Sequence, residues 1–341
     1  MFKTVKIKDA VGRVLAHDVT EIRKGEFKGR AFKKGHRIRN VDICHLQRLG
    51  KEHIFVLEVE DGWLHENDAV VAMAHAFSGP GIGWQGEPNE GKLNLKAETD
   101  GLLKVAVEPL AEVNALGDVM CATRHTNTLV GKDDIVAGTR AIPLVIQLGI
   151  VEKAVSIARS SRGLVHIKPL RQANAGIVIT GNEVFTRLIE DRFEEVLRQK
   201  IDQIGSNVVG VAFAPDDPDI ISGEIRLLIS SGADLILTTG GMSVDPDDVT
   251  CEGIRRAGGH AEAYGAPVLP GAMFMTAEID GVPILGVPAC GLYHETTILD
   301  LVLPRILAGE TIGRHDLAMM GHGGLCLNCE TCRFPACPFG K

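Results

Sequence analysis

From Gly176 onward the chain alternates short apolar stretches with longer amphipathic ones, and this alternation limits its fold more than any other feature. Leu235-Ile236-Leu237 has no polar position, as expected of a strand that is buried on both faces. Strands that alternate with helices are joined by right-handed crossovers, and such crossovers produce parallel sheets. We expect strands at 177–179, 208–213, 235–237 and 283–287, and helices at 186–204, 218–231, 247–257 and 293–307. This part of the chain is therefore predicted to be an α/β domain with a mostly parallel sheet.

The residues before this domain mix short strands with helices and lack the regular alternation. We expect a helix at 41–49, a strand at 54–57 and a helix over 62–77. Apolar residues alternate from Leu93 to Val107 around Asp100-Gly101, which predicts a β-hairpin. The predicted division is an α+β region over 1–170, the α/β domain over 171–310 and a cysteine-rich tail over 311–341.

Composition excludes some classes of partner. The chain has 36 Lys and Arg against 44 Asp and Glu, a net charge of -8, which argues against nucleic acid because phosphate-binding surfaces are basic. No segment reaches the roughly 18 uninterrupted apolar residues of a membrane span, and the start of the chain lacks the apolar core of a signal peptide. We therefore expect a cytoplasmic protein with no membrane partner, in which the eight cysteines do not form disulfides.

Three predicted loops follow strands at the edge where ligands bind in open α/β sheets. They are Thr180-Gly181-Asn182-Glu183, the segment 238–250 and the segment 287–291. The Gly240-Gly241 pair permits close approach of the backbone to a ligand, and with Ser243 it could present N–H groups to a phosphate. Acidic residues beside this pair suit a divalent cation. The alternative is that the glycine pair only forms a turn between a strand and a helix.

These residues resemble the molybdopterin-binding domain shared by molybdopterin adenylyltransferases and molybdopterin molybdenumtransferases of the MoeA type. The resemblance rests on Thr180-Gly181-Asn182-Glu183, Asp216-Asp217-Pro218, Thr239-Gly240-Gly241-Met242-Ser243, Asp248-Val249-Thr250, Pro270-Gly271 and Val287-Pro288. It covers about 176–309, and a weaker resemblance to the molybdenumtransferases occurs at 12–16 and 35–38. It implies a three-layer fold, molybdopterin or its adenylate as ligand, molybdate as a further substrate and Mg²⁺ as a cofactor.

The resemblance also implies roles for individual residues. Cofactor-binding roles fall on Thr180, Gly181, Asp191, Gly240, Gly241, Ser243 and Pro288, and catalytic roles on Glu183 and Asp248. For Asp191 and Asp248 the alternative is a charge placed near a helix N-terminus, where the helix dipole favours it.

The sequence departs from the family at three places, and these departures leave the function open between several classes. The segment Gly25 to Ala31 lacks the family's Asp-Gly, Asn182 stands for an aspartate, and Cys290-Gly291 replaces Asn-Pro. The leading hypothesis is molybdenum cofactor biosynthesis, in which the protein binds the pterin and promotes molybdate insertion as a transferase. The rival is a non-catalytic carrier or sensor, and a CinA-type hydrolase is a third class. Association into a homo-oligomer is left open.

Four cysteines crowd the end of the chain. Cys326, Cys329, Cys332 and Cys337 follow one another at short spacing, and Pro338 comes directly after the last. Four thiolates at such spacing can hold a zinc ion or an iron–sulfur cluster. A bacterial ferredoxin run has one residue fewer before its last cysteine, which brings a structural zinc site into close competition. The alternative is a flexible or redox-active tail without metal.

Overall fold

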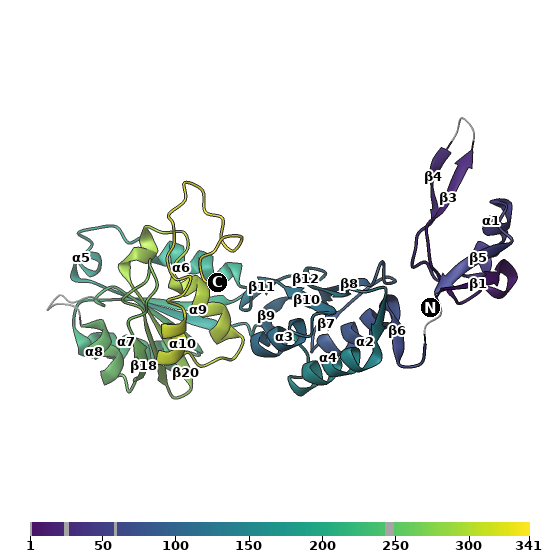
Figure 1. The fold of residues 1–341 in the computed structure, drawn as a ribbon. Coiled ribbons are helices and arrows are strands. Elements are labelled where there is room, and N and C mark those ends of the chain that lie inside the picture. The colour runs from purple at the N-terminus through teal and green to yellow at the C-terminus, as the bar shows by residue number, and fades with distance from the viewer. Residues whose placement is uncertain (1, 24–26, 58–59, 243–248) are drawn as a thin grey trace. The chain divides into compact units, whose positions relative to one another are not determined.

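The computed structural model describes the whole chain except residues 1, 24–26, 58–59 and 243–248 (Figure 1). The described chain forms two compact units. The N-terminal unit comprises 1–98, 105–124 and 133–166, and the C-terminal unit comprises 99–104, 125–132 and 167–341. Within the described residues, none of the helices combines the length and apolar character needed to cross a membrane.

A six-stranded sheet forms the centre of the C-terminal unit. Its strands, in spatial order, are β16 (Asn207–Ala214), β15 (Asn174–Thr180), β17 (Leu235–Thr239), β20 (Val282–Val287), β19 (Met275–Ile279) and β18 (His260–Tyr264). The first four strands are parallel, and β19 and β18 extend the sheet in antiparallel pairing. The predicted α/β fold with a mostly parallel sheet is therefore confirmed, and the antiparallel pair was missed.

Helices cover both faces of this sheet and complete three layers (Figure 1). Ile177 and Ile179 of β15 pack into a core with α6 (Phe193–Gln203) and α9 (Ile298–Leu307). Val178 points to the other face and packs with residues of two further helices. These are α7 (Pro218–Ser230) and α8 (Thr250–Arg256). Alternate residues of one strand thus supply two separate cores, as the period of a β-strand requires.

Two predicted helices begin later than expected, because local caps fix their starts. Both carboxylate oxygens of Asp191 accept hydrogen bonds, from the backbone N–H groups of Phe193 (3.0 Å) and Glu194 (2.9 Å). This interaction sets the start of α6 at Phe193. Between β15 and α6 lies the short helix α5 (Asn182–Phe185). Thr297 and Asp300 form a capping box that starts α9 at Ile298, after the 3₁₀ helix η3 (Ala289–Leu292).

The N-terminal unit contains several small sheets and three longer helices. Its strands are β1 (Phe2–Lys6), β2 (Val14–Leu15), β3 (Val19–Arg23), β4 (Phe27–Phe32), β5 (His53–Leu57), β6 (Trp63–His65), β7 (Ile82–Gly83), β8 (Lys92–Ala97), β10 (Val119–Thr123), β12 (Ile135–Ala141) and β13 (Val145–Gln147). Its helices are η1 (Ile7–Asp9), η2 (Asn40–Asp42), α1 (Ile43–Arg48), α2 (Glu66–Phe77), α3 (Val107–Asn114) and α4 (Leu148–Ser160). The helix expected over 62–77 begins only at Glu66, because Trp63–His65 pairs with β13 as a strand.

The predicted hairpin around Asp100-Gly101 is wrong. Strands do lie on both sides of it, but β8 pairs with β12 and β7, whereas β9 (Gly101–Val105) pairs with β11 (Thr128–Val130) and β14 (Val165–Lys168). Gly101 is needed for a different reason. A Cβ atom on it would lie 2.5 Å from the carbonyl oxygen of Lys168, so the glycine permits close packing against a neighbouring strand.

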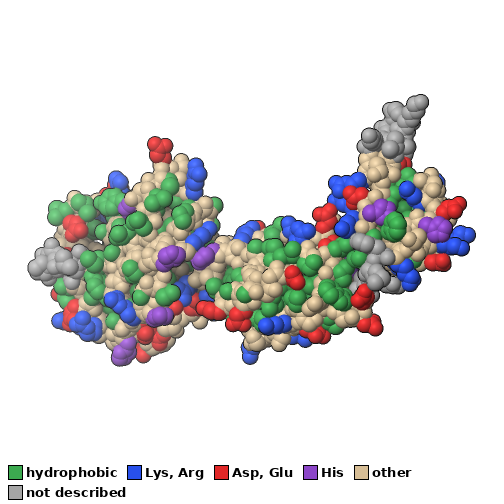
Figure 2. Space-filling model, viewed as in Figure 1, with side chains coloured by type: hydrophobic (Ala, Val, Ile, Leu, Met, Phe, Trp, Pro, Cys, Tyr) green, Lys and Arg blue, Asp and Glu red, His purple; other side chains and the backbone are tan. Residues whose placement is uncertain are grey.

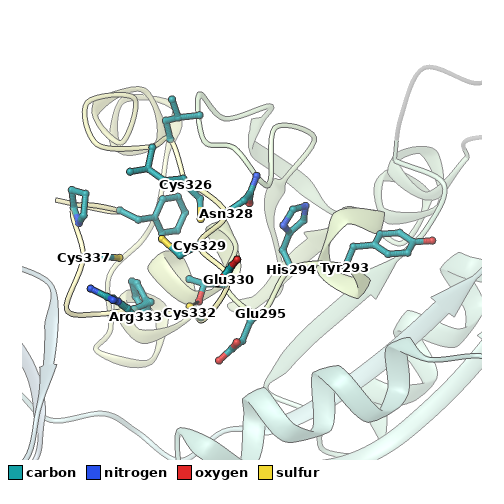
Figure 3. A pocket seen from close by; sticks show the side chains of 16 residues that line it. Tyr293, His294, Glu295, Cys326, Asn328, Cys329, Glu330, Cys332, Arg333 and Cys337 are labelled. Carbon is teal, nitrogen blue, oxygen red and sulfur yellow. Dashed lines mark hydrogen bonds between the residues drawn. The ribbon is translucent and has the colours of Figure 1, made fainter.

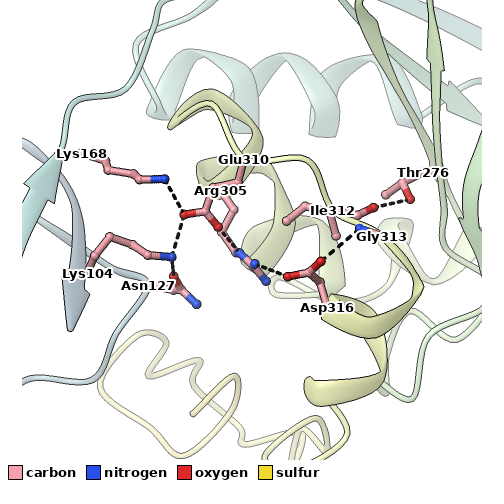
Figure 4. A network of polar contacts seen from close by, with 9 residues as sticks. All are labelled: Lys104, Asn127, Lys168, Thr276, Arg305, Glu310, Ile312, Gly313 and Asp316. Carbon is pink, nitrogen blue, oxygen red and sulfur yellow. Dashed lines mark hydrogen bonds and ion pairs between the residues drawn. The ribbon is translucent and has the colours of Figure 1, made fainter. Parts of the chain in front are cut away.

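Charged side chains of both signs are interspersed on the visible face of each unit (Figure 2). A network of polar contacts is partly buried in the C-terminal unit (Figure 4). Glu310, after α9, accepts hydrogen bonds from Lys104 (2.6 Å) and Arg305 (2.8 Å). Lys168 contacts the same carboxylate at 3.2 Å, and Arg305 also binds Asp316 at 2.8 Å. Burial alone would raise the pKa of Glu310, but the bonds from Lys104 and Arg305 lower that pKa to about 2.

This network makes a testable prediction about stability and pH. A carboxylate with a lowered pKa stabilises the folded state above its unfolded pKa, ordinarily 4.5, and the stabilisation is lost as the pH falls toward about 2. We expect Glu310→Gln to reduce the free energy of unfolding at pH 7 by about 2–3 kcal/mol. The deficit should shrink steadily below about pH 4.5, as urea denaturation followed by far-ultraviolet circular dichroism will show.

The matched control is Asp134→Asn, which removes one partner of the exposed Arg124–Asp134 ion pair. Exposed pairs contribute little, so this variant should differ from wild type by less than about 1 kcal/mol. Tryptophan fluorescence reports only the N-terminal unit, because Trp63 and Trp84 both lie there, and its transition should not shift in Glu310→Gln. A deficit for Glu310→Gln that is independent of pH would contradict the assigned pKa.

Candidate functional site

A cavity of about 640 Å³ opens where β17 and β20 end. Four segments distant in the sequence form its wall: 240–242 after β17, 269–273 before β19, 288–290 after β20, and the tail. The wall is completed by His294, and the tail contributes Leu325, Cys326 and Asn328. The cavity therefore lies at the edge of the sheet that the sequence indicated.

The Gly240-Gly241 turn can be formed only by glycine. Their φ angles are +78° and +51°, a region that other residues adopt only with strain. A Cβ atom on Gly240 would lie 2.5 Å from the carbonyl oxygen of Thr180, and one on Gly241 would lie 2.5 Å from the Oγ1 atom of Thr250. The turn is thus packed directly on β15 and α8, and its bare backbone faces the cavity.

Threonine hydroxyls support this turn from below. Thr180 is buried, donates a hydrogen bond from Oγ1 to the carbonyl oxygen of Thr239 (2.7 Å), and contacts the hydroxyl of Thr250 at 2.9 Å. The Oγ1 atoms of Thr238 and Thr239 are buried and have no hydrogen-bond partner among the described residues. These two side chains are adjacent in β17, so they lie on opposite faces of the sheet, and neither lines the cavity.

The structure brings only some of the expected site residues together. Gly240, Gly241 and Pro288 line the cavity, whereas the described residues Thr180, Gly181, Glu183 and Asp191 do not. Thr180 lies beneath the turn, and Asp191 caps α6 with both carboxylate oxygens, which matches the helix-terminus alternative for that residue. Ser243 and Asp248 lie outside the described residues.

The loop after β15 is organised by its own contacts. The backbone N–H of Asn182 donates to the carboxylate of Asp216 (2.9 Å), and the backbone N–H of Asp216 donates to the Oδ1 atom of Asn182 (3.2 Å). This reciprocal pair ties together the ends of β15 and β16. Glu183 is exposed, and its Oε1 atom lies 3.1 Å from the position of a Cβ on Gly181, so it folds back on its own turn.

Sulfur and imidazole groups lie on the cavity wall, some in the predicted loops 238–250 and 287–291 and others in segments that were not expected there. Met242, Met273, Cys290, His294 and Cys326 all line it. Burial raises the pKa of the Cys290 thiol, against a smaller opposing effect of a hydrogen bond from its own backbone N–H. Met242 and Cys290 belong to the predicted loops, whereas Met273 and Cys326 come from segments that no motif placed at this edge.

The tail joins the cavity through backbone pairing. Leu325 forms a parallel bridge with Leu269, in which the N–H of Leu269 donates to the carbonyl of Gly324 and the N–H of Cys326 donates to the carbonyl of Leu269, both at 2.8 Å. Phe339 near the end of the tail is 3% exposed and belongs to the same core as α9. The tail therefore packs into the C-terminal unit, and no sequence pattern indicated this.

The four tail cysteines line a second cavity, of about 380 Å³, together with Tyr293 to Thr296 (Figure 3). The hydroxyl of Thr296 lies 3.2 Å from the Sγ atom of Cys332. All four thiols are free, and within the described part of the chain no three His, Cys, Asp or Glu side chains are arranged to hold a metal ion. The predicted ligands therefore share one cavity without forming a preformed metal site.

Two segments of the chain match known families. Residues 176–308 match the family described as a probable molybdopterin binding domain, and residues 4–58 match a domain of unknown function (DUF8806). The first of these matches covers the segment whose loop motifs indicated the same family.

Curated relatives match a shorter stretch. A CinA-like protein of Mycobacterium tuberculosis is 36% identical over 84 residues, which is 25% of this chain and 20% of that protein. A CinA-like protein of Mycolicibacterium vanbaalenii is 34% identical over 96 residues, 28% of this chain and 23% of that protein. The chain thus spans about a fifth of the length of these relatives.

Solved structures with similarity include two described as molybdopterin biosynthesis proteins. MoaB of Thermus thermophilus is 22% identical, with a TM-score of 0.34, and the match covers 41% of this chain and 98% of that one. MoeA of Pyrococcus horikoshii is 14% identical, with a TM-score of 0.34, and the match covers 91% of this chain and 75% of that one.

The geometry of the glycine turn predicts the effect of a small substitution. Gly241→Ala must adopt a φ of +51° and also place Cβ 2.5 Å from the hydroxyl of Thr250. Gly205→Ala is the matched control, because its φ is +74° but nothing lies within 4 Å of its Cβ. We expect a loss of about 1 kcal/mol for Gly205→Ala and about 2–3 kcal/mol for Gly241→Ala in urea denaturation. Equal losses would show that the turn is not packed on Thr250.

Proposed function

We infer that the C-terminal unit binds molybdopterin or its adenylate in the cavity beside the Gly240-Gly241 turn. The observation that supports this most is the turn itself, in which two glycines without side chains line the cavity while they pack on Thr180 and Thr250. Backbone N–H groups can hold a phosphate without basic side chains, and the described residues of the wall include neither Lys nor Arg. The volume of about 640 Å³ lies in the usual range for small-ligand pockets.

The composition of the wall also suits a flat heterocycle. Met242, Leu269, Pro270, Met273 and Pro288 offer apolar surface, and thioethers adapt their shape to planar rings. One end of the ligand would thus be held by the backbone turn and the other by apolar side chains.

The activity proposed for this site is molybdenum cofactor biosynthesis in which molybdate is inserted into the bound pterin, as a molybdenumtransferase does. Magnesium would be held by carboxylates and, when bound, would offset the negative charge of the ligand. No described residue of the wall is a carboxylate, so this role would fall on Asp248, outside the described residues, with Glu183 as a more distant partner. We propose a cytoplasmic location for this reaction.

A carrier or sensor of the pterin is the second candidate, and a specific observation favours it. The cysteine tail forms part of the cavity wall, and four thiols that share one cavity could hold an iron–sulfur cluster or zinc. In this function the protein would protect or report the cofactor without changing it.

Binding is tested by placing a charge in the cavity without straining the backbone. Ala289 lines the cavity and is exposed, so Ala289→Glu adds a carboxylate that repels an anionic ligand. The Kd of Ala289→Glu for molybdopterin should be at least about tenfold higher than that of wild type in an anaerobic titration. Ala111→Glu, on the exposed face of α3 in the N-terminal unit, should bind like wild type. If Ala289→Glu and Ala111→Glu bind equally, the ligand does not occupy this cavity.

Catalysis is tested separately from binding. If Asp248 and Glu183 act on the metal or on the transition state, Asp248→Asn and Glu183→Gln should lose molybdate insertion while they keep most of their affinity for the pterin. Insertion is measured as molybdenum retained by the pterin after incubation with magnesium and molybdate. Wild-type protein that binds the pterin but inserts no molybdenum would exclude the transferase and leave the carrier or sensor.

A further inference from the structure

The part of the tail that contains the four cysteines, residues 325–340, is a loop held at both ends. At its start, the pairing of Leu325 with Leu269 fixes the loop to a segment that lines the cavity beside the Gly240-Gly241 turn, called the pterin cavity below. At its end, the N–H of Gly340 donates to the carbonyl of Gly323 at 2.9 Å, so the two ends of the loop meet. Phe339 anchors this junction in the core. The intervening residues therefore cannot move away from the domain as a free tail would.

The loop separates two cavities and belongs to the wall of both. Four residues, His294, Leu325, Cys326 and Asn328, line the pterin cavity and the thiol-lined cavity. Figure 3 shows Cys326 and Asn328 on the same stretch of the loop, with His294 on the facing segment. Anything that repositions Cys326 in one cavity thus alters the wall of the other.

A metal bound by the four thiols would reposition this stretch. A tetrahedral zinc site needs each sulfur about 2.3 Å from the ion. The cysteines share a cavity of about 380 Å³, but they are not gathered into such an arrangement in the described structure. Binding must therefore contract the loop. Because its ends are fixed, the contraction falls on the residues between them, including the shared wall.

We propose that the tail binds one thiophilic metal centre through Cys326, Cys329, Cys332 and Cys337, and that this centre controls the affinity of the neighbouring cavity for its pterin ligand. The proposal rests on the pterin-binding function inferred above. The metal would fix the positions of Cys326 and its neighbours in the shared wall, so the ligand would no longer meet the entropic cost of ordering them. Metal and pterin should therefore bind with positive cooperativity, and each should raise the affinity for the other by the same factor.

The experiment uses full-length protein purified without oxygen, with Zn²⁺ as the probe metal. Zinc stoichiometry is measured by competition with a chromogenic chelator, and the Kd for molybdopterin is measured in the zinc-free and zinc-loaded states. The test variant is Cys332→Ser, because Cys332 lines the thiol cavity but not the pterin cavity, and serine can keep the contact with Thr296. Cys329→Ser, at an exposed thiol, is a second variant, and Cys44→Ser, an exposed cysteine of the N-terminal unit, is the control.

We expect one zinc per wild-type chain and a Kd for molybdopterin that falls about fivefold or more on loading. Cys44→Ser should behave like wild type. Cys332→Ser and Cys329→Ser should weaken zinc binding at least about a hundredfold and bind molybdopterin as zinc-free wild type does, with or without zinc. Wild type without stoichiometric zinc, or a molybdopterin Kd unchanged by loading, would overturn the inference but leave pterin binding intact. Stoichiometric zinc without molybdopterin binding in either state would overturn the proposed function and, with it, the coupling.

Discussion

The parallel pairing of β15 with β17 is the constraint on which the rest of the C-terminal unit depends. It places Thr180 and Thr239 side by side at one edge, where the hydroxyl of the first bonds the carbonyl of the second. The glycine turn then packs directly on Thr180, which leaves no space for a Cβ atom. Because parallel strands end at a common edge, loops from distant parts of the chain meet there and form one cavity.

Elements were predicted best from the sequence where the residues of one segment alone determine its structure. Leu235-Ile236-Leu237 is apolar because both of its faces are buried, and the structure places it at the centre of the sheet. Prediction was less successful where one local interaction outcompetes a longer pattern. The amphipathic pattern over 186–204 spans more residues than the helix, because the cap formed by Asp191 fixes the first turn at Phe193. Likewise, Asp100-Gly101 suggested a hairpin, although partners distant in the sequence decide the pairing of β9.

The same distinction explains the candidate site. Gly240, Gly241 and Pro288 could be found from the sequence because glycine and proline have backbone requirements that a motif records. The part of the wall that comes from the tail could not be found in this way. Its position depends on the pairing of Leu325 with Leu269, which joins two backbones and places no demand on the type of side chain. Cysteine spacing indicated chemistry in the tail but contained no information about where the tail lies.

The discontinuous C-terminal unit has a consequence for the order in which the protein is synthesised. Residues 99–104 and 125–132 belong to this unit, yet they leave the ribosome well before its sheet. Glu310, the acceptor for Lys104 and Lys168, lies 142 residues beyond even the later of these two lysines. Strands β9 and β11 can pair with each other early, but Lys104 lacks this carboxylate until the residues after α9 have emerged. The nascent chain cannot complete its domains strictly one after another, so residues made late finish the folding of some of the early ones.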